Sequence, residues 1–427
     1  MSVEQIKSII LTGLVLLSIF LFGYIMTFQQ SYDRVNNQEY VEEITISHKI
    51  DIKELIHPKK IVWKKDGQYV GSEAMIVIQP IIDEIQKWNF YDFNLATEEF
   101  AAKWHERAEA LIFQYDDIPL ELIKTILSVE QDGIPNILYH YMFIFPEDLE
   151  KQEAVVYFAS SDLRTAVKSR VKYHDQLNFI RELQEFADKS SPYLVYEHTA
   201  GSIIFVKNEP HLEVKTYPYY TTEIPIQAFV EVLFPDPSVV TKTENTYTNG
   251  TSLLEVYEDH KTIHFVNPTV AKNQEIAPSQ IIQTAMNFVN QHGGWTDQYL
   301  FSHFDAENQE VIFQLFLSDY MVVGSNYLSV SIGNSGIYAY RRPYFSLNFP
   351  VQPYVKTLPS GQEVLDYLEA TKKIDLAYIT DIAIGYEMTF MEEDSMFLFE
   401  PFWYYRIGTD WLPVFEAEQG GKHNGLE

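Results

Sequence analysis

The sequence has 427 residues, enough for two to four domains, and its 60 acidic and 31 basic side chains give a formal net charge of −29. A body with this charge repels nucleic acid and anionic membrane surfaces, which argues against a nucleic-acid partner. A hydrophobic content of 46% with 15% aromatic residues excludes general disorder. The absence of cysteine excludes both disulfide bonds and a lipid-modified cysteine anchor.

An uncharged apolar segment close to the N-terminus predicts a single membrane-spanning helix. Residues 8–32 carry no charged side chain, and Ile9–Phe28 is almost wholly apolar. About twenty helical residues span roughly 30 Å, the thickness of a bilayer's hydrocarbon core. Lys7 and the α-amino group precede the segment and acidic residues follow it, which favours a cytoplasmic N-terminus. We expect cytoplasmic residues 1–8, a transmembrane helix at 9–29 and an extracytoplasmic body anchored to the cell membrane.

The alternative interpretation of this segment is a cleaved signal peptide. Signal peptides have an apolar region of about 7–15 residues that ends in small side chains. The segment here is longer and ends with Thr27-Phe28-Gln29-Gln30, so retention is the stronger prediction. An extracytoplasmic body without cysteine is more typical of a bacterial surface protein than of a eukaryotic secreted one.

Beyond this segment, alternating aromatic and β-branched residues predict half-buried antiparallel strands. The predicted strands are Asn136–Phe145, Ala154–Ala159, Ser202–Val206, His211–Tyr217, Leu253–Glu258, Thr262–Val266, Val311–Leu317 and Met396–Ile407. Amphipathic spacing and helix-start residues, such as Pro119 at a first helical position, predict helices between them. The predicted helices are Thr97–His105, Pro119–Leu127, Asp175–Asp188, Pro278–His292 and Ser360–Thr371.

The last two helices belong to two similar units. Each unit starts with Pro-Ser, at Pro278 and at Pro359, continues as a helix and leads into a long hairpin. True repetition and two independent helix-plus-hairpin units both fit this pattern, which is a common α+β arrangement. We expect an α+β fold in which antiparallel sheets with packed helices form three extracytoplasmic domains, at residues 30–165, 166–275 and 276–427.

No motif predicts a catalytic residue, a cofactor site or a metal site. The segment Gly333–Gly336 reads Gly-Asn-Ser-Gly, which lacks the spacing of the Gly-x-Ser-x-Gly nucleophile elbow and is typical of a β-turn. His105-Glu106 lacks the second histidine, four residues on, that a zinc-binding helix requires.

Two acidic clusters and a histidine–aspartate pair are candidate metal ligands, but for each of them a solvated turn or strand end is the stronger interpretation. His303 and Asp305 share one side of a predicted strand, but a solvated strand end is the stronger interpretation. The clusters Asp116-Asp117 and Glu392–Asp394 lack the spacing of a calcium-binding loop, and we expect solvated turns there. A carboxylate pair for glycoside hydrolysis stays open, because its spacing is set in space and not in sequence.

Two aromatic clusters, Tyr217–Tyr220 and Phe402–Tyr405, are candidate surfaces for a glycan or a protein partner. Alternate residues of a strand face opposite sides of a sheet. At least half of the second cluster is therefore expected in the core, and core packing is the stronger interpretation of both.

One side of the predicted membrane helix carries small and hydroxyl residues. Ser8, Thr12, Gly23 and Thr27 fall within an arc of about 100° on a helical projection. Such residues let helix backbones approach and can hydrogen-bond across helices, although they are also ordinary in membrane helices. We hypothesise that they form a partner-packing face, since the short cytoplasmic segment has no room for a signalling domain.

Several short strings resemble the YycH (WalH) family. They are Glu4-Gln-Ile-Lys-Ser-Ile-Ile-Leu-Thr-Gly-Leu-Val-Leu-Leu-Ser-Ile, Thr27-Phe-Gln29, His57-Pro-Lys-Lys-Ile-Val-Trp63 and the tail Gly420-Gly-x-x-Asn-Gly-Leu-Glu427. The anchor is the most specific of these, and the middle of the chain matches mainly by pattern. Length, a single N-terminal anchor and the absence of cysteine agree with the resemblance.

The resemblance implies a regulator of the WalK–WalR two-component system of low-GC Gram-positive bacteria, which controls cell-wall metabolism. It implies an extracytoplasmic body of three α+β domains, a sister protein, YycI, as partner, and contact with the sensor histidine kinase WalK (YycG) through transmembrane helices. It implies no catalytic residues and no cofactor. Whether the kinase is activated or inhibited does not follow, since the direction differs between lineages.

We therefore predict a non-enzymatic, membrane-anchored regulator of a WalK-like sensor histidine kinase. The first alternative is a surface protein that binds or hydrolyses cell-wall glycan, which predicts a cleft with converging acids and exposed aromatic side chains. The second is an assembly scaffold, whose anchor would not affect the output of the kinase.

Overall fold

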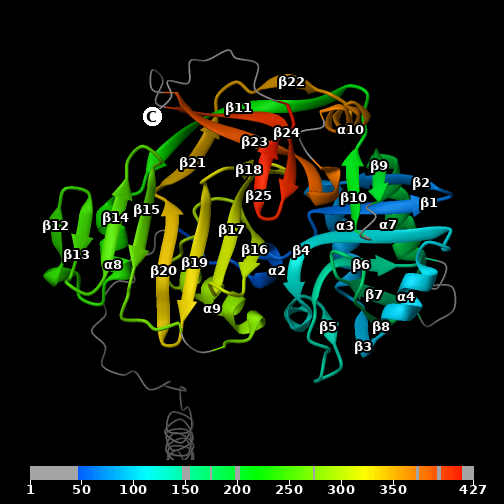
Figure 1. The fold of residues 1–427 in the computed structure, drawn as a ribbon, viewed down its shortest axis with the longest axis horizontal. Coiled ribbons are helices and arrows are strands. Elements are labelled where there is room, and N and C mark those ends of the chain that lie inside the picture. The colour runs from blue at the N-terminus through cyan, green and yellow to red at the C-terminus, as the bar shows by residue number, and fades with distance from the viewer. Residues whose placement is uncertain are drawn as a thin grey trace, which may run out of the picture. The chain divides into compact units, whose positions relative to one another are not determined.

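Two large sheets with helices on their faces form the part of the chain that the structure describes, residues 47–146, 154–173, 176–197, 202–272, 275–371, 375–391 and 396–415 (Figure 1). The structure is a computed structural model. These residues all belong to one unit, which begins at Thr45. Within this part of the chain no helix is long and apolar enough to cross a membrane, and the predicted helix at 9–29 lies outside it.

The first sheet has ten strands in the order β10-β9-β2-β1-β4-β6-β7-β8-β3-β5. Neighbouring strands run antiparallel, except β3 and β5, which are parallel. The strands are β1 Lys60–Lys65, β2 Gln68–Ser72, β3 Asn89–Leu95, β4 Glu109–Pro119, β5 Ser128–Val129, β6 Leu138–Ile144, β7 Ala154–Ala159, β8 Ala166–Lys172, β9 Ser191–Glu197 and β10 Ile203–Lys207.

Helices cover both faces of the first sheet. In β1, Ile61 lies in one hydrophobic core with residues of α3 (Met75–Ile85) and α7 (Gln176–Lys189), whereas Val62 lies in a second core with residues of α4 (Thr97–Lys103). Because a strand buried on both faces need not alternate, β1 carries no period-two signal and the sequence did not predict it. The buried residues of two short helices, α2 (Ile52–Leu55) and α5 (Ile123–Ile126), belong to the same core as Ile61.

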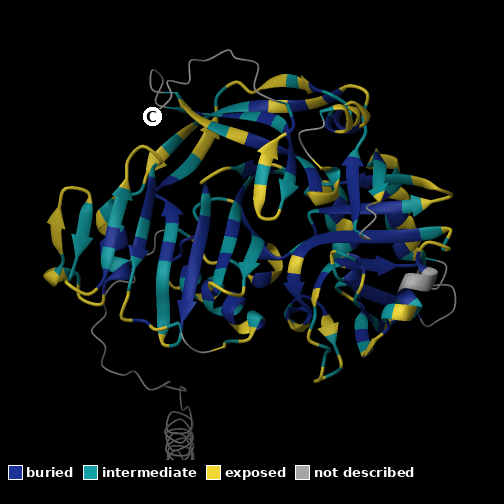
Figure 2. Cartoon of the chain, viewed as in Figure 1, coloured by how far each residue is buried: buried dark blue, intermediate teal, exposed yellow. Residues whose placement is uncertain are grey.

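The second sheet has fifteen strands, twelve of them in the order β12-β13-β14-β15-β20-β19-β17-β18-β23-β24-β11-β21, while β16, β22 and β25 pair with β17, β11 and β24. Its strands are β11 Leu212–Glu223, β12 Thr241–Thr243, β13 Thr246–Thr248, β14 Leu253–Tyr257, β15 Thr262–Val266, β16 Tyr299–Asp305, β17 Glu310–Leu317, β18 Tyr320–Val323, β19 Tyr327–Gly333, β20 Gly336–Pro343, β21 Phe345–Pro350, β22 Tyr354–Leu358, β23 Ile379–Met391, β24 Met396–Ile407 and β25 Asp410–Pro413. Its helices are α8 Ile226–Leu233, α9 Pro278–Gln291 and α10 Gly361–Ala370. Figure 2 shows that its central strands are largely buried, whereas the edge strand β12 is exposed.

Strands that alternate in the sequence are confirmed. Strands β7, β15 and β24 have the predicted bounds, and β11 continues to Glu223, beyond the predicted end at Tyr217. Helices α4, α7, α9 and α10 are confirmed with shorter or shifted ends. The prediction of one helix at Pro119–Leu127 is wrong in its first part, because Pro119 still pairs with Leu138 as the last residue of β4. A 3-10 turn at Leu120–Leu122 then leads into α5.

The two helix-plus-hairpin units are present, but their helices pack differently. Helix α9 packs on β17 and β19 of its own sheet, whereas α10 lies against β9 of the first sheet. Gly361 opens α10 so close to β10 that a Cβ atom there would lie 2.3 Å from the carbonyl oxygen of Lys207. The sequence pattern therefore predicts the elements of each unit and not the surface on which the helix lies.

Between the two sheets the chain passes from the end of β10 at Lys207 to the start of β11 at Leu212. The described residues thus divide at this point by sheet membership. The division into three domains at 30–165, 166–275 and 276–427 stays a prediction.

We call the described residues up to Lys207 the first half of the body and those from Leu212 onward the second half. In the second half, a buried polar centre lies at the end of α9. Arg342 is fully buried, and its guanidinium donates to the carbonyl oxygen of Gly294 at 2.7 Å and to the hydroxyl of Thr296 at 3.1 Å. His292 lies beside it, with Nε2 3.3 Å from the hydroxyl of Tyr340. Burial, with the nearby charge of Arg342, lowers the pKa of His292 from 6.5 to about 4.

We expect His292 to make the protein sensitive to acid. The unfolded chain takes up a proton at this side chain near pH 6.5, whereas the folded chain does so only near pH 4, so the free energy of unfolding falls as the pH drops through this window. The loss attributable to His292 should reach roughly 2–3 kcal/mol at pH 4.5. Urea unfolding of the native protein and of His292→Gln at pH 7.5 and 4.5 measures it, and equal pH dependence in both proteins would contradict the assignment.

Candidate functional site at the junction of the two sheets

The chain enters the described body through residues 47–57, here called the entry segment. His48 forms an antiparallel bridge with Trp295 of the second half. The Asn290 side chain at the end of α9 accepts from the backbone N–H of Ile50 at 2.8 Å and donates to its carbonyl oxygen at 2.9 Å. Trp295 Nε1 donates to the same Asn290 oxygen at 2.7 Å. The segment that follows the predicted anchor is thus first bound to the second half and only then enters β1 of the first sheet.

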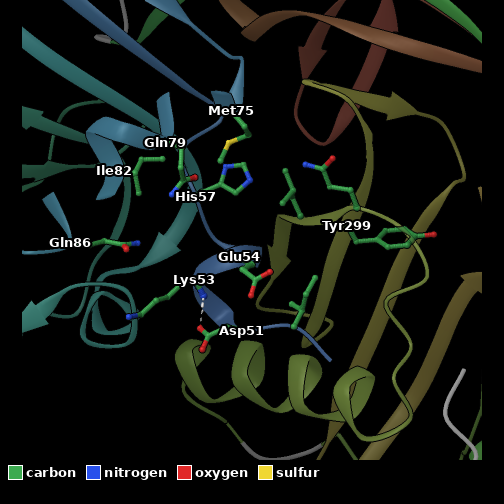
Figure 3. A pocket seen from close by; sticks show the side chains of 12 residues that line it. Asp51, Lys53, Glu54, His57, Met75, Gln79, Ile82, Gln86 and Tyr299 are labelled. Carbon is green, nitrogen blue, oxygen red and sulfur yellow. Dashed lines mark hydrogen bonds between the residues drawn. The ribbon is translucent and has the colours of Figure 1, made fainter. Parts of the chain in front are cut away.

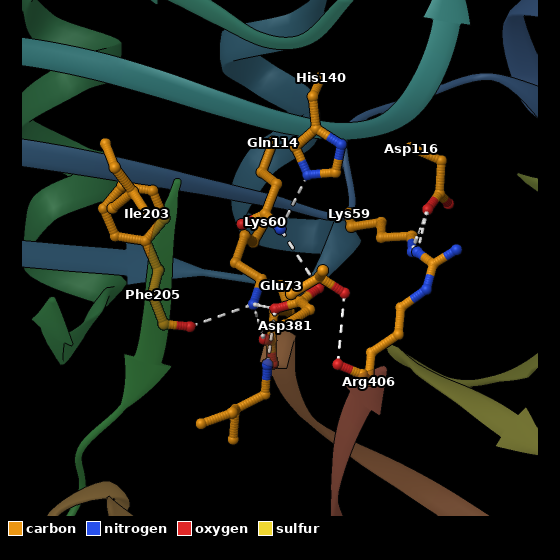
Figure 4. Close-up of polar contacts among 12 residues, drawn as sticks. Lys59, Lys60, Glu73, Gln114, Asp116, His140, Ile203, Phe205, Asp381 and Arg406 are labelled. Carbon is orange, nitrogen blue, oxygen red and sulfur yellow. Dashed lines mark hydrogen bonds and ion pairs between the residues drawn. The ribbon is translucent and has the colours of Figure 1, made fainter. Parts of the chain in front are cut away.

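Directly after the entry segment, β1 places Lys60 in a buried ionic cluster (Figure 4). The Lys60 ammonium lies 3.5 Å from Asp381 of β23 and 3.6 Å from Glu73, and it donates to the carbonyl oxygen of Phe205 at 3.3 Å. Burial alone lowers the pKa of Lys60, but the carboxylates of Asp381 and Glu73 more than offset it, so its pKa is raised. The side chain is therefore a permanent cation and not a base for proton transfer.

A second set of charges extends the cluster. Asp116 of β4 accepts from Lys59 at 2.7 Å and from Arg406 of β24 at 3.1 Å, and its side chain is almost fully buried. The ring of Trp411 in β25 lies 5.9 Å from the Lys59 ammonium and 5.8 Å from the Arg406 guanidinium. We call the six charged residues of the two sets the junction cluster: Lys59, Lys60, Glu73, Asp116, Asp381 and Arg406.

Both aspartates of the junction cluster lie where the pairing of neighbouring strands shifts register. The pairing of β4 with β6 shifts register between Gln114 and Ile118, next to Asp116. The pairing of β23 with β24 shifts between Ile379 and Asp381. Regular pairing is interrupted at each of these two places, and both carboxylates lie at the boundary between the sheets. Gln114 completes the contact by donating to Asp381 at 3.2 Å.

The junction cluster joins the two halves of the body electrostatically. Three cations face three carboxylates, and two of the ion pairs cross from the first sheet to the second. Ion pairs that are buried and balanced hold the geometry of an interface, because the removal of one partner leaves a charge without compensation. The junction cluster can therefore set the position of one sheet relative to the other. Its six charged side chains do not include a nucleophile beside a general base.

The structure corrects one of the acidic predictions. Asp116 is not part of a solvated turn, because it lies buried in β4 between Lys59 and Arg406. Its neighbour Asp117 is exposed and lies 3.1 Å from Nδ1 of His140. Partial desolvation alone raises the pKa of Asp117, but the hydrogen bond from His140 and nearby positive charge outweigh it, so the pKa is lowered. The cluster Glu392–Asp394 lies outside the described residues.

Residues weighed as metal ligands do not converge. His303 is partly buried in β16, where burial and the charge of Arg406 lower its pKa. The Asp305 carboxylate accepts from the backbone N–H groups of Glu307 and Asn308 and so closes a turn. Across the part of the chain that the structure describes, no three His, Asp or Glu side chains meet closely enough to hold a metal ion.

The remaining motifs have structural roles. Gly333 and Gly336 pair directly as the ends of β19 and β20, which confirms the predicted turn. In the cluster Phe402–Tyr405, three of the four rings are buried in β24, and Trp403 donates to the carbonyl oxygen of Pro359 at 2.9 Å. In Tyr217–Tyr220 the exposed ring is Tyr220, which contacts Phe349 at a centroid distance of 5.5 Å. The predicted packing face of Ser8, Thr12, Gly23 and Thr27 lies outside the described residues.

A cavity lies next to the entry segment, between α2, α3 and β16 (Figure 3). Its volume is about 520 Å³. It is lined by Ile50, Asp51, Lys53, Glu54, His57, Met75, Gln79, Ile82, Gln86, Gln298, Tyr299 and Leu300. Sequence reasoning missed both this cavity and the junction cluster, since their members come from distant parts of the chain and form no motif.

Comparison with known proteins identifies the family. Residues 4–190 match the YycH protein N-terminal domain, and residues 203–421 match the YycH protein C-terminal domain. The two-component system WalR/WalK regulatory protein YycH of Bacillus subtilis (strain 168) is 21% identical over 456 aligned residues, which cover 99% of each chain. The crystal structure of YycH from Bacillus subtilis has the same fold, with a TM-score of 0.76 and 19% identity over 87% of this chain and 98% of that one. The two domain matches together span almost the whole sequence, and the chain belongs to the YycH family.

Proposed function

We propose that this chain is a membrane-anchored, non-enzymatic regulator of a WalK-like (YycG-like) sensor histidine kinase and that it acts with a YycI-like partner. The observation that carries the proposal is the alignment with a WalR/WalK regulatory protein over 99% of both chains. The apolar segment at 9–29 supports an anchored protein with an extracytoplasmic body. Control of cell-wall metabolism is the output expected of such a kinase.

The proposed mechanism is a population shift. A regulator changes the balance between two signalling states only if it binds them with different affinities. The face of Ser8, Thr12, Gly23 and Thr27 would supply this contact by packing against the transmembrane helices of the kinase. The entry segment is bound to the second half and leads into the first sheet, which supports a body whose two halves are both joined to the start of the described chain.

Larger side chains on the proposed packing face should weaken association with the kinase. Thr12→Leu together with Gly23→Leu would hold the helices apart and remove a hydroxyl, and we expect at least a several-fold loss of cross-linking between the two full-length proteins in membranes. The matched control is Ser18→Leu, which also replaces a small hydroxyl residue but lies on another side of the same helix. Association that stays unchanged in the double variant would exclude this face, and failure of the native protein to co-purify with any kinase would overturn the function itself.

A further inference from the structure

The cavity beside the entry segment has walls from both halves of the body. Lys53, Glu54 and His57 come from the entry segment, and Gln86 comes from the end of α3 in the first half. Gln298 and Leu300, around the start of β16, belong to the second half. Figure 3 shows Met75, Gln79, Ile82 and Gln86 of the first half on one side of the cavity and Tyr299 of the second half on the other, with Glu54 of the entry segment between them.

Several polar groups of the cavity wall have no partner in the described body. Lys53, Glu54 and Gln298 are exposed to solvent at the cavity and Gln86 is partly buried, and none of these four side chains has an ion pair or hydrogen bond to another described residue. Gln79 differs from these groups, since its amide donates to Asp83 at 2.6 Å. Besides Gln79, one cation, two amides and two carboxylates therefore line one cavity, and the second carboxylate, that of Asp51, accepts among the described residues only from the backbone N–H of Lys53.

The apolar part of the wall is compatible with a small side chain of a ligand. Met75, Ile82 and Leu300 contribute aliphatic or thioether surface between the polar groups. A volume of about 520 Å³ lies within the range of roughly 300–1,000 Å³ that small-molecule sites occupy. A mixed wall of this kind suits a ligand with charged ends and a short, weakly apolar middle.

We propose that this cavity binds a short peptide with free termini. The Glu54 carboxylate would accept hydrogen bonds from the α-ammonium group of the peptide, and the Lys53 ammonium would donate to the peptide's carboxylate. The amides of Gln86 and Gln298 each offer both a donor and an acceptor to the peptide bonds between the termini. A bound peptide contacts the entry segment, the first half and the second half at once, and so restrains the segment that leads to residues 1–46.

Calorimetric titration of the full-length protein with trialanine tests the proposal. Trialanine has free termini and the smallest side chains that give a peptide a hydrophobic surface, and we expect saturable binding at concentrations below about 10 mM. N-acetyl-trialanine amide keeps the two peptide bonds of trialanine and has an uncharged amide group at each end in place of the terminal charges, and it should bind about tenfold more weakly or not at all. Absence of saturable binding, or equal binding of the two peptides, would overturn the proposal.

Variants locate the binding. Glu54→Gln and Lys53→Met should each weaken the binding of trialanine about tenfold, because each removes one charge-assisted contact. Glu213→Gln and Lys215→Met are the matched controls, since both residues are exposed on β11 and neither lines the cavity. Hydrogen exchange should slow in residues 50–57 and 75–86 when trialanine is bound. Binding that the two cavity variants leave unchanged would place the site elsewhere. No kinase takes part in these measurements, so their outcome is independent of the function proposed above.

Discussion

Lys60→Met should destabilise the protein by about 3–5 kcal/mol, the usual cost of removing one partner from a buried ion pair. Lys60 is 2% exposed, and its ammonium faces Asp381 and Glu73 at 3.5 and 3.6 Å. Methionine fills a similar volume, so the loss arises from two carboxylates left in a buried site without their cation. Chemical denaturation of the native protein and the variant at pH 8 measures this difference in unfolding free energy.

One comparison separates the charge effect from a simple loss of packing. Lys65→Met changes the same residue type in the same strand, but its partner Glu109 and its own side chain are partly solvated, so we expect a loss of less than about 1 kcal/mol. A loss in Lys65→Met as large as that in Lys60→Met would indicate that packing, and not the buried charge, is responsible.

Trp295→Ala should be comparably destabilising, by about 3–5 kcal/mol, because it opens a large cavity in the second half. Trp295 is fully buried, packs edge-on against Phe313 at a centroid distance of 5.0 Å and donates to Asn290. Asn290 in turn holds both backbone groups of Ile50. The substitution should therefore also loosen the entry segment, and hydrogen exchange at the Ile50 amide should accelerate more than the global loss of stability requires.

The control for this variant is an exposed aromatic residue. Tyr354 is 50% exposed on the edge strand β22, and Tyr354→Ala should change the unfolding free energy by less than about 0.5 kcal/mol. Trp295→Phe should lose an amount of unfolding free energy between those lost by Tyr354→Ala and Trp295→Ala, since it retains a ring but cannot donate to Asn290. If Ile50 exchanges at the same rate in native and Trp295→Ala proteins after correction for stability, the bridge to His48 does not depend on this ring.

Several strands with one solvated face could be predicted from the sequence. Strand β24 alternates buried and partly exposed residues over most of its length, and its bounds at Met396 and Ile407 were predicted to the residue. Strands β1 and β4 are buried in long runs and gave no period-two signal. Helix α3 was missed because β-branched residues and Pro80 make its sequence resemble a buried strand.

The junction cluster could not be predicted, for two physical reasons. Its contacts join distant residues: Gln114 and Asp381 are 267 positions apart, and Asp116 and Arg406 are 290 apart. The two aspartates also depend on register shifts, which a pattern of residue types does not encode. Asp116-Asp117 therefore resembles a polar turn in the sequence, although Asp116 is buried.

The arrangement of strands also has a consequence for the order in which the chain folds during synthesis. Every strand of the first sheet lies before Asn208, so all its pairings can form while the second half is still being made. During that time Lys60 has Glu73 beside it but lacks Asp381, and β9 lacks the helix α10 that later lies against it. At about 5–20 residues per second the ribosome takes on the order of ten seconds to bring Asp381 into the chain. Until Asp381 is made, the Lys60 ammonium therefore has one carboxylate partner instead of two, and a strand made late in synthesis completes the charge balance of one made early.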